Sequence, residues 1–494
     1  MPACSIIIPL FDSRRTIAEA LESVRAQTVS DWEAIIVNDG STDDGPVVAR
    51  AVAARDPRFR VVDQSNQGLA AARNTGIAHA SAPYLLFLDS DDWLEPNALA
   101  DLLPAATSSP SGAAYAAAEW RDDEGRSLGW SSDVDAGPIG LHELLDYNRF
   151  PVHAQLIRRD VLGDLRFRRG YYGCEDYDLW TRLALRGVAW SPVDRLVCGY
   201  RMRPGSMSRS FDRMARSIAA VIEQTFVAAR ELQAKAGDIP CSPCDCSMLR
   251  RTSVLERNAL DFATRACLDG EDGCEQAVAI YADRSPVRHI ASAAAAEAAY
   301  WSIPYAECRA PTTWLEHADR YAEALVSFWS RCIEKGWAAH DLPGRVIPHL
   351  ASWLVRPQTI AAHLADAAAE SRLPVVLIGF GANGRRLARA LMARNIPCSA
   401  RDDRALEPAE TVLGTATIKV FSNRAPFDPD ALHIVTPGDD RAIMRSLPPQ
   451  LRRLRWSQVR DTLSAAALAQ LHPAFARAQQ RVTSMPRCLD ASMP

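Results

Sequence analysis

Three stretches of the chain decide the fold: residues 35–44 read IIVNDGSTDD, residues 66–76 read NQGLAAARNTG, and residues 84–93 read YLLFLDSDDW. The first and the third place acidic residues directly after a short apolar run that is typical of a buried strand. Asp89, Ser90 and Asp91 therefore lie at a strand end and offer the hard oxygen ligands that a divalent cation on a nucleotide diphosphate requires. The pattern predicts a protein that handles a sugar nucleotide.

The segments around these stretches alternate between strand and helix patterns. Strands alternating with helices predict parallel βαβ units with helices on both faces of the sheet. The expected strands are Ser5–Pro9, Ala34–Val37, Arg60–Val62 and Tyr84–Leu88, and the expected helices are Thr16–Ala26, Pro46–Ala54 and Leu69–Ala78.

An acidic residue follows each of the four expected strands, namely Asp12, Asp39, Asp63 and Asp89. In an open α/β sheet, ligands bind at this carboxyl edge. Four carboxylates at one edge repel one another unless a cation or a ligand donor lies among them. The alternative is that each Asp caps the next helix, and it stays open for Asp12 and Asp63 in particular.

Residues 3–103 resemble the nucleotide-binding half of a family 2 glycosyltransferase with the GT-A fold. The resemblance rests on five segments in the same order and spacing: SIIIPLFD, ESVRAQT, DWEAIIVNDGSTDD, NQGLAAARNTGIAHA and YLLFLDSDDWLEP. It implies a sugar-nucleotide donor, a Mn²⁺ or Mg²⁺ ion and transfer with inversion. Position 12 is Asp where the family often has Asn, so the role of Asp12 stays open.

The same resemblance implies roles for individual residues. Asp91 would ligate the metal, Asp89 would face the ribose and the donor sugar, and Asp39 would contact the base. The full set of donor-site residues in this half is Pro9, Phe11, Asp39, Arg73, Asp89 and Ser90.

An inverting transferase also needs a base that takes the proton from the attacking acceptor hydroxyl. Residues 171–180, YYGCEDYDLW, place Glu175 and Asp176 at the start of an amphipathic helix pattern. The pair resembles the family's Glu-Asp motif, whose second acid is the usual base, so Asp176 is the predicted base. The alternative is that both acids only favour the positive end of the helix.

Departure of the nucleotide requires a positively charged group beside the diphosphate, which stabilises the negative charge that develops there. Residues 200–208, YRMRPGSMS, predict a basic loop in which Arg201, Arg203 and Ser206 bind phosphate oxygens. The family's loop frequently carries His where Arg203 stands. Arg cannot ligate a metal, so direct pairing of Arg203 with phosphate is expected, with a plain basic surface loop as the alternative.

A second glycine-rich signal follows the buried-strand pattern PVVLI at residues 374–378. Gly379, Gly381 and Gly384 would allow a tight turn and close approach of a phosphate, and Asp402 lies about where a ribose-binding acid is expected. The segment resembles the small Rossmann-like modules appended to some bacterial polysaccharide-biosynthesis enzymes. The alternative is a retained fold without a ligand.

Length and composition set the domain organisation. The chain has 494 residues, which predicts about three domains, and its net charge of −4 gives no reason to expect nucleic-acid binding. The predicted fold class is α/β, with four parts: a GT-A catalytic domain at 1–215, a helical middle region at 216–370, a Rossmann-like domain at 371–464, and a C-terminal helix and tail at 465–494.

The sequence therefore predicts a metal-dependent inverting glycosyltransferase that moves a sugar, with uridine diphosphate as the favoured carrier, to a saccharide or lipid-linked saccharide acceptor. No membrane span is expected, because no window approaches the length of a transmembrane helix. Scattered cysteines favour a cytoplasmic location, with peripheral membrane contact and oligomerisation left open. Two other hypotheses remain: an NAD(P)-dependent oxidoreductase and a non-catalytic sugar-nucleotide-binding protein.

Overall fold

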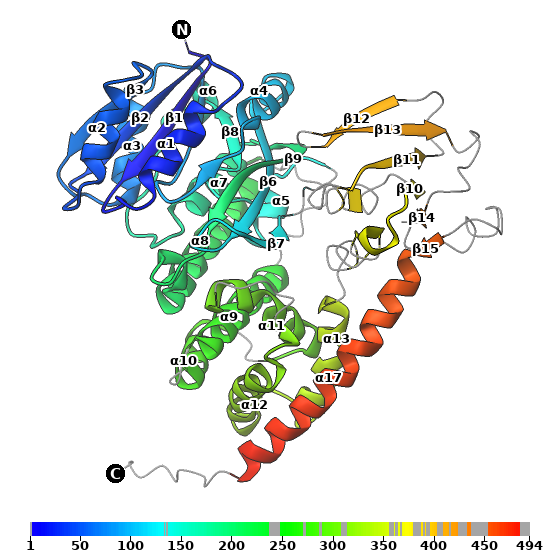
Figure 1. Cartoon of the computed structure of the whole chain (residues 1–494). Coiled ribbons are helices and arrows are strands. Elements are labelled where there is room, and N and C mark those ends of the chain that lie inside the picture. The colour runs from blue at the N-terminus through cyan, green and yellow to red at the C-terminus, as the bar shows by residue number, and fades with distance from the viewer. Residues whose placement is uncertain are drawn as a thin grey trace, which may run out of the picture. The chain divides into compact units, whose positions relative to one another are not determined.

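The computed structural model of the chain contains two compact units (Figure 1). One consists of Met1–His289 with Ser302–Ala310, and the other of Ile290–Trp301 with Pro311–Pro494. The structure describes residues 2–132, 134, 137–236, 248–269, 273–285, 289–307, 314–354, 360, 364–365, 368–378, 387–388, 391, 396–402, 409–413, 416–422, 432–435 and 453–484.

A nine-stranded sheet with the order β3-β2-β1-β4-β8-β6-β9-β5 organises the first unit, and β7 pairs with β6. The first four strands in this order, β3, β2, β1 and β4, are parallel to one another. The pairs β4–β8, β6–β8 and β5–β9 are antiparallel. The strands are β1 Cys4–Leu10, β2 Trp32–Asp39, β3 Phe59–Gln64, β4 Tyr84–Phe87, β5 Trp93–Leu94, β6 Ala113–Arg121, β7 Ser127–Ser131, β8 Gln155–Arg158 and β9 Ser191–Arg201.

The alternation predicted for the N-terminal hundred residues is confirmed. The helices between the parallel strands are α1 Ile17–Arg25, α2 Gly45–Ala53 and α3 Leu69–His79. Every residue of β1 is buried, which fits a central strand covered on both faces.

Gly76 explains the glycine of the Arg-Asn-x-x-Gly segment. It lies in α3, where a Cβ atom at this position would come within 2.3 Å of Ile7 Cγ2 on β1. Only glycine therefore lets α3 pack this closely on the central strand, and the close packing fixes the position of Arg73 one turn earlier.

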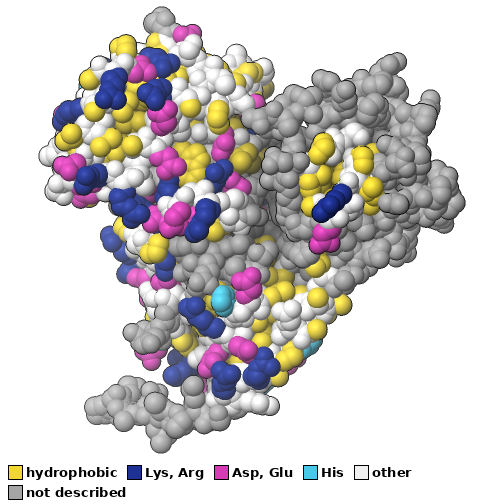
Figure 2. All heavy atoms as spheres, in the orientation of Figure 1, with side chains coloured by type: hydrophobic (Ala, Val, Ile, Leu, Met, Phe, Trp, Pro, Cys, Tyr) yellow, Lys and Arg dark blue, Asp and Glu magenta, His cyan; other side chains and the backbone are white. Residues whose placement is uncertain are grey.

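The rest of the first unit is mainly helical, with α4 Ala98–Ser108, α5 Leu141–Leu144, α6 Arg159–Leu162, α7 Glu175–Leu185, the 3₁₀ turn η1 Met207–Arg209, α8 Phe211–Ala236, α9 Met248–Leu268 and α10 Gly273–Arg284. A hydrophobic core joins α7 to α8 and α9; it contains Tyr177, Val221, Ile222, Phe226, Val254 and Leu255. Figure 2 shows basic and acidic side chains intermingled on one face of the molecule, as the small net charge suggests.

The second unit contains a helical part and a six-stranded sheet. The sheet order is β12-β13-β11-β10-β14-β15, and all its pairs are parallel except β12–β13. Its strands are β10 Val375–Ile378, β11 Cys398–Asp402, β12 Ala409–Leu413, β13 Ala416–Ser422, β14 Leu432–Val435 and β15 Arg453–Arg455, and helices elsewhere are α11 Ser292–Glu307, α12 Ala318–Glu334, α13 Leu342–Leu354 and α17 Trp456–Ser484.

One boundary differs from the expectation. The C-terminal helix begins at Trp456, not near Ser464, since α17 follows directly after β15. Two stacked aromatic contacts hold this helix in the unit, because Phe475 lies between Trp314 and Trp329. The division into four parts proposed from the sequence stays a prediction.

Candidate active site

Asp39, at the end of β2, organises the turn that leads into α3. Its carboxylate accepts hydrogen bonds from the backbone amides of Gln67 and Gly68, both at 2.8 Å, and from Gln64 Nε2 at 2.7 Å. The side chain is buried. Asp39 therefore fixes the start of the helix that carries Arg73, and its contact with a nucleotide base stays a prediction.

Arg73 brings together two acidic segments that are far apart in the sequence. Its guanidinium donates to Asp89 Oδ1 at 2.6 Å and also to Glu175 Oε1, 102 residues away in the chain. Arg73 is only 2% exposed. Burial alone would lower its pKa, but the carboxylates of Asp89 and Glu175 outweigh burial, so the pKa of Arg73 is raised and the group stays charged.

We expect replacement of Arg73 by methionine to destabilise the protein strongly. The change would leave two carboxylates without their cation in a largely buried site, which costs about 3 kcal/mol or more. Denaturant unfolding of the full chain would measure the loss. Arg50→Met is the matched control, because it breaks an ion pair with Asp63 in which both side chains are about half exposed; such surface pairs contribute about 0–1 kcal/mol. Equal losses in the two variants would contradict the prediction.

Asp176 follows Glu175 in the first turn of α7. Its Oδ1 accepts the Tyr177 amide at 2.7 Å, and its Oδ2 accepts Asn148 Nδ2 at 3.0 Å. Burial, and then the neighbouring Glu175, raise the pKa of Asp176 to about 7. A carboxylate with a pKa near neutral is well suited to accept a proton from a hydroxyl group at physiological pH.

The turn after β4 presents Asp91 toward the basic loop. Asp91 Oδ2 lies 2.9 Å from the Arg203 guanidinium. Burial and the nearby Asp89 raise the pKa of Asp91, while Arg203 opposes that rise. Ser90, between the two acids, is buried and donates to Ser13 Oγ at 2.9 Å. Its hydroxyl thus supports the turn.

A second group of potential metal ligands lies beside Asp91. One ligand atom from each of Asp89, Asp92 and His153 falls within 4.8 Å of the others. His153 is fully buried, and burial lowers its pKa to about 4, so the imidazole is neutral, as a metal ligand must be. Its Nδ1 lies 3.4 Å from Asp92 Oδ2. The residues present therefore fit a divalent cation.

Sequence reasoning missed Asp92 and His153 as members of this group. Asp92 was visible as the fourth letter of DSDD, and burial together with Asp91 and Asp89 raises its pKa well above the ordinary value. His153 is an isolated histidine in PVHAQ with no motif around it. It comes near Asp89 and Asp92 only through the tertiary fold.

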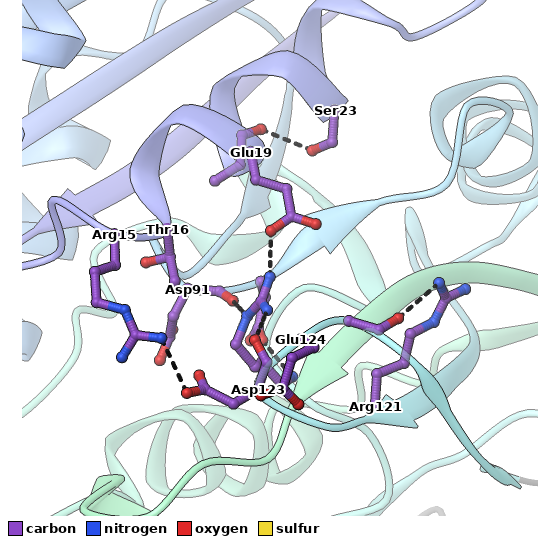
Figure 3. A network of polar contacts seen from close by, with 12 residues as sticks. Arg15, Thr16, Glu19, Ser23, Asp91, Arg121, Asp123 and Glu124 are labelled. Atoms are coloured by element: carbon purple, nitrogen blue, oxygen red, sulfur yellow. Dashed lines mark hydrogen bonds and ion pairs between the residues drawn. The ribbon is translucent and has the colours of Figure 1, made fainter.

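Arg201, at the end of β9, supports the acidic turn, and Figure 3 labels its partners Glu19, Asp91 and Asp123. Its guanidinium donates to the Asp91 carbonyl at 2.8 Å, to the Asp123 carbonyl and to Glu19 on α1. Its backbone amide also donates to Asp92 Oδ1 at 2.7 Å. The sequence predicted that Arg201 contacts the donor directly. The arrangement in the structure instead favours a role of Arg201 in holding the acidic turn.

The basic loop continues with Arg203 and Ser206. Arg203 is partly exposed and pairs with Asp91, and its Nε has no hydrogen-bond partner among the described residues. Ser206 precedes η1, and its hydroxyl lies 2.9 Å from Ser208 Oγ. Both residues thus lie on the loop that brings the Arg203 guanidinium next to the acidic turn.

The remaining predicted residues lie in three different settings. Pro9 is buried within β1, whereas Phe11, just beyond it, is 47% exposed. Asp402 ends β11 in the C-terminal sheet. Gly379, Gly381 and Gly384 lie outside the described residues.

The sequence left open whether Asp12 and Asp63 cap the next helix or belong to a ligand site, and the structure shows which groups each of them contacts. Asp12 has a positive φ of 44° and its Oδ1 accepts the backbone amide of Thr42 at 2.7 Å, which lowers its pKa. Asp63 pairs with Arg50 and accepts from Asn38 Nδ2 at 2.8 Å. Asp12 therefore fixes the loop between β2 and α2, and Asp63 forms a surface ion pair.

Comparison with known proteins identifies the class to which the N-terminal domain belongs. Residues 5–166 match the family model described as Glycosyl transferase family 2. The N-terminal part of the chain is therefore a family 2 glycosyltransferase domain.

Individual relatives agree with this assignment. The chain is 36% identical over 217 residues to the uncharacterized glycosyltransferase YibD of Escherichia coli, covering 42% of this chain and 63% of YibD. It is 39% identical over 99 residues to an Escherichia coli chondroitin synthase, covering 20% of this chain and 14% of that protein. The chain spans less than a third of the length of several further curated relatives.

Among solved structures, TarS 1–349 of S. aureus in complex with UDP-GlcNAc is similar over 86% of this chain and 98% of that chain. The sequence identity is 14% and the TM-score is 0.38. Within the described residues, no helix has both the length and the apolar character that crossing a membrane requires.

Proposed function

We propose that the protein transfers a sugar from a nucleotide-diphosphate donor to a hydroxyl group of a saccharide acceptor, with inversion at the anomeric carbon. The observation that carries the proposal is the pairing of one guanidinium, that of Arg73, with both Asp89 and Glu175. This pairing places the acidic turn after β4 next to the start of α7, which carries Asp176. Donor-side and acceptor-side groups then meet at one edge of the sheet.

In the proposed reaction, Asp176 takes the proton of the acceptor hydroxyl as its oxygen forms the bond to the anomeric carbon. The bond from that carbon to the diphosphate breaks, and the nucleotide diphosphate leaves with the electron pair. A divalent cation held through Asp91, with Asp89 beside it, would stabilise the negative charge that develops on the diphosphate. The group Asp89, Asp92 and His153 is the alternative ligand set for that cation.

Arg203 would supply a further positive charge to the leaving diphosphate. Because a charge-assisted hydrogen bond contributes about 1.5–3 kcal/mol, we expect Arg203→Ala to raise the KM for the donor by about tenfold or more. Arg195→Ala is the control: Arg195 also lies on β9, and its nearest ion-pair partner, Asp101, is 3.9 Å away. Steady-state kinetics with varied donor would measure both, and an unchanged donor KM in Arg203→Ala would contradict the role.

The carrier is proposed to be uridine diphosphate, and the acceptor a surface polysaccharide or its lipid-linked precursor. Thermal denaturation of the full chain with a series of nucleotide sugars, with and without Mn²⁺ or Mg²⁺, would identify the donor. Product analysis by NMR would then give the anomeric configuration. Retention of configuration, or no stabilisation by any nucleotide sugar, would count against the proposal. A cytoplasmic location with peripheral membrane contact stays a prediction.

For the C-terminal sheet we propose a Rossmann-like domain. The parallel order β13-β11-β10-β14-β15 supports this, because it equals the order 3-2-1-4-5 along the chain once the antiparallel β12 is left out, and this is the order of the first five strands of a doubly wound sheet. Ligands in such sheets bind beyond the carboxyl ends of the strands at which the strand order reverses, here β10 and β14. Dinucleotides added to the same thermal series would test ligand binding here, and they would also test the alternative of an NAD(P)-dependent oxidoreductase.

A further inference from the structure

The loop between α5 and β8 makes a direct contact with the predicted base. Asn148 Nδ2 donates to Asp176 Oδ2 at 3.0 Å. An ionised carboxylate can only accept hydrogen bonds, so the amide nitrogen of Asn148 must face it. Since Asp176 Oδ1 accepts the Tyr177 amide, the two donors together fix the rotation of the carboxylate group. The orientation of the base is therefore set from two segments.

Helix α9 holds this loop in place. Arg257 and Asn258 both donate to the backbone carbonyl of Asp146, at 3.1 and 3.4 Å. The Arg257 guanidinium also lies 3.8 Å from Asp146 Oδ1. Two residues before Asn148, the chain is thus fixed to a residue 111 positions further along the sequence.

The loop also shares a hydrophobic core with helices α7, α8 and α9. Leu145 from the loop and Tyr177 from α7 are buried together with apolar residues of α8 and α9. Tyr177 Oη donates to the Leu144 carbonyl at 2.5 Å. The loop, the helix that carries the base, and helices α8 and α9 therefore form one packed assembly. Both helices lie beyond the residues that match the family model.

We propose that Asn148 is a positioning residue for the base Asp176, and that helices α8 and α9 hold it there as a structural wall of the acceptor site. The inference rests on the proposed function, because it assumes that Asp176 accepts the proton. It gives the helical segment after the family 2 domain a role that the sequence did not show.

The charges around Asp176 define what a change at position 148 should do. Glu175 on α7 raises the pKa of Asp176, whereas Arg73 on α3, the Tyr177 amide and Asn148 lower it. Asn148→Ala removes one donor that favours the ionised form, so the acid limb of the rate profile should move up by about one pH unit. Asn148→Asp adds a like charge and should move it further.

Turnover at saturating donor, measured as a function of pH, would test this order. At pH 7, kcat of Asn148→Ala should fall about fivefold if the pKa of the base rises by about one unit, while the donor KM stays unchanged. A general loss of packing would lower the rate equally at every pH. Coincident pH profiles for the wild type, Asn148→Ala and Asn148→Asp would overturn the proposal.

The contribution of α9 has a matched test that also serves if Asn148→Ala fails to fold. Arg257→Ala releases the loop and should shift the profile in the same direction as Asn148→Ala. Arg251 is on the same helix but pairs with Glu223 of α8, so Arg251→Ala should leave the profile unchanged. Equal profiles for the two arginine variants would exclude a role for α9.

Failure of the proposed function would look different from failure of this inference. If the wild type turns over no sugar nucleotide, the pKa of Asp176 can still be read by infrared titration of its carboxyl band, with Asp176→Asn as the blank. A pKa that rises in the order wild type, Asn148→Ala, Asn148→Asp supports the positioning role without any turnover. An unchanged pKa refutes it.

Discussion

Replacement of Asp176 by asparagine is expected to lower kcat by about 10²–10⁴-fold, because general-base catalysis by a positioned side chain contributes about that much. Asparagine keeps the size of the side chain but cannot accept the proton of the acceptor hydroxyl. Donor binding, measured by calorimetry, should be unaffected, since Asp176 acts on the acceptor.

The pH dependence of the wild type gives an independent check on the same residue. Asp176 must be ionised to act as a base, and its pKa is raised to about 7. Turnover should therefore be low near pH 6, rise through pH 7 and level off near pH 8. Residual activity of Asp176→Asn with the same acid limb as the wild type would assign the base to another group.

Loss of the cation should have an effect of similar size. Removing a group that stabilises developing negative charge costs about 10²–10³-fold in rate, so chelation with EDTA should slow the wild type by at least that factor. Asp91→Ala should reproduce the loss, and chelation should then have little further effect on the variant. Turnover assays before and after readdition of Mn²⁺ or Mg²⁺ would measure it.

Two ligand arrangements for that cation can be separated by the same approach. In the structure the carboxylate of Asp91 is paired with Arg203, so a cation at Asp91 must compete with the guanidinium. If Asp89, Asp92 and His153 hold the ion instead, His153→Gln should weaken Mn²⁺ binding while Asp91→Ala does not. Mn²⁺ affinity measured by electron paramagnetic resonance distinguishes them. Full turnover by the wild type in EDTA would contradict metal dependence altogether.

The Arg203–Asp91 pair also bears on what the basic loop can do. The sequence predicted that Arg203 binds phosphate directly, and its guanidinium lies beside the acidic turn where a diphosphate would need it. Arg201, two residues earlier, points its donors at the Asp91 and Asp123 carbonyls and at Glu19. Two arginines that look equivalent in the sequence therefore have different surroundings, because Arg201 is the last residue of β9, whereas Arg203 lies on the loop beyond the strand.

Recognition of the N-terminal domain required only short segments. The apolar runs of β1, β2 and β4 and the acids that follow them could be read from the sequence, because strand burial and strand ends depend on residues within a few positions of one another. The same applies to Glu175 and Asp176 at the start of α7. The beginning of α17 was placed too late, because Trp456, two residues after Leu454, also fits the apolar alternation of the preceding strand.

The sequence by itself thus determined the order of strands and helices in the first hundred residues and the acidic groups at the carboxyl edge, because hydrophobic periodicity acts locally. Only the tertiary structure decided which of these groups meet: Arg73 with Glu175 across 102 residues, Asn148 with Asp176, and His153 with Asp89 and Asp92. Such pairs depend on how helices pack on the sheet. Packing is a property of the whole folded unit, and no local pattern specifies it.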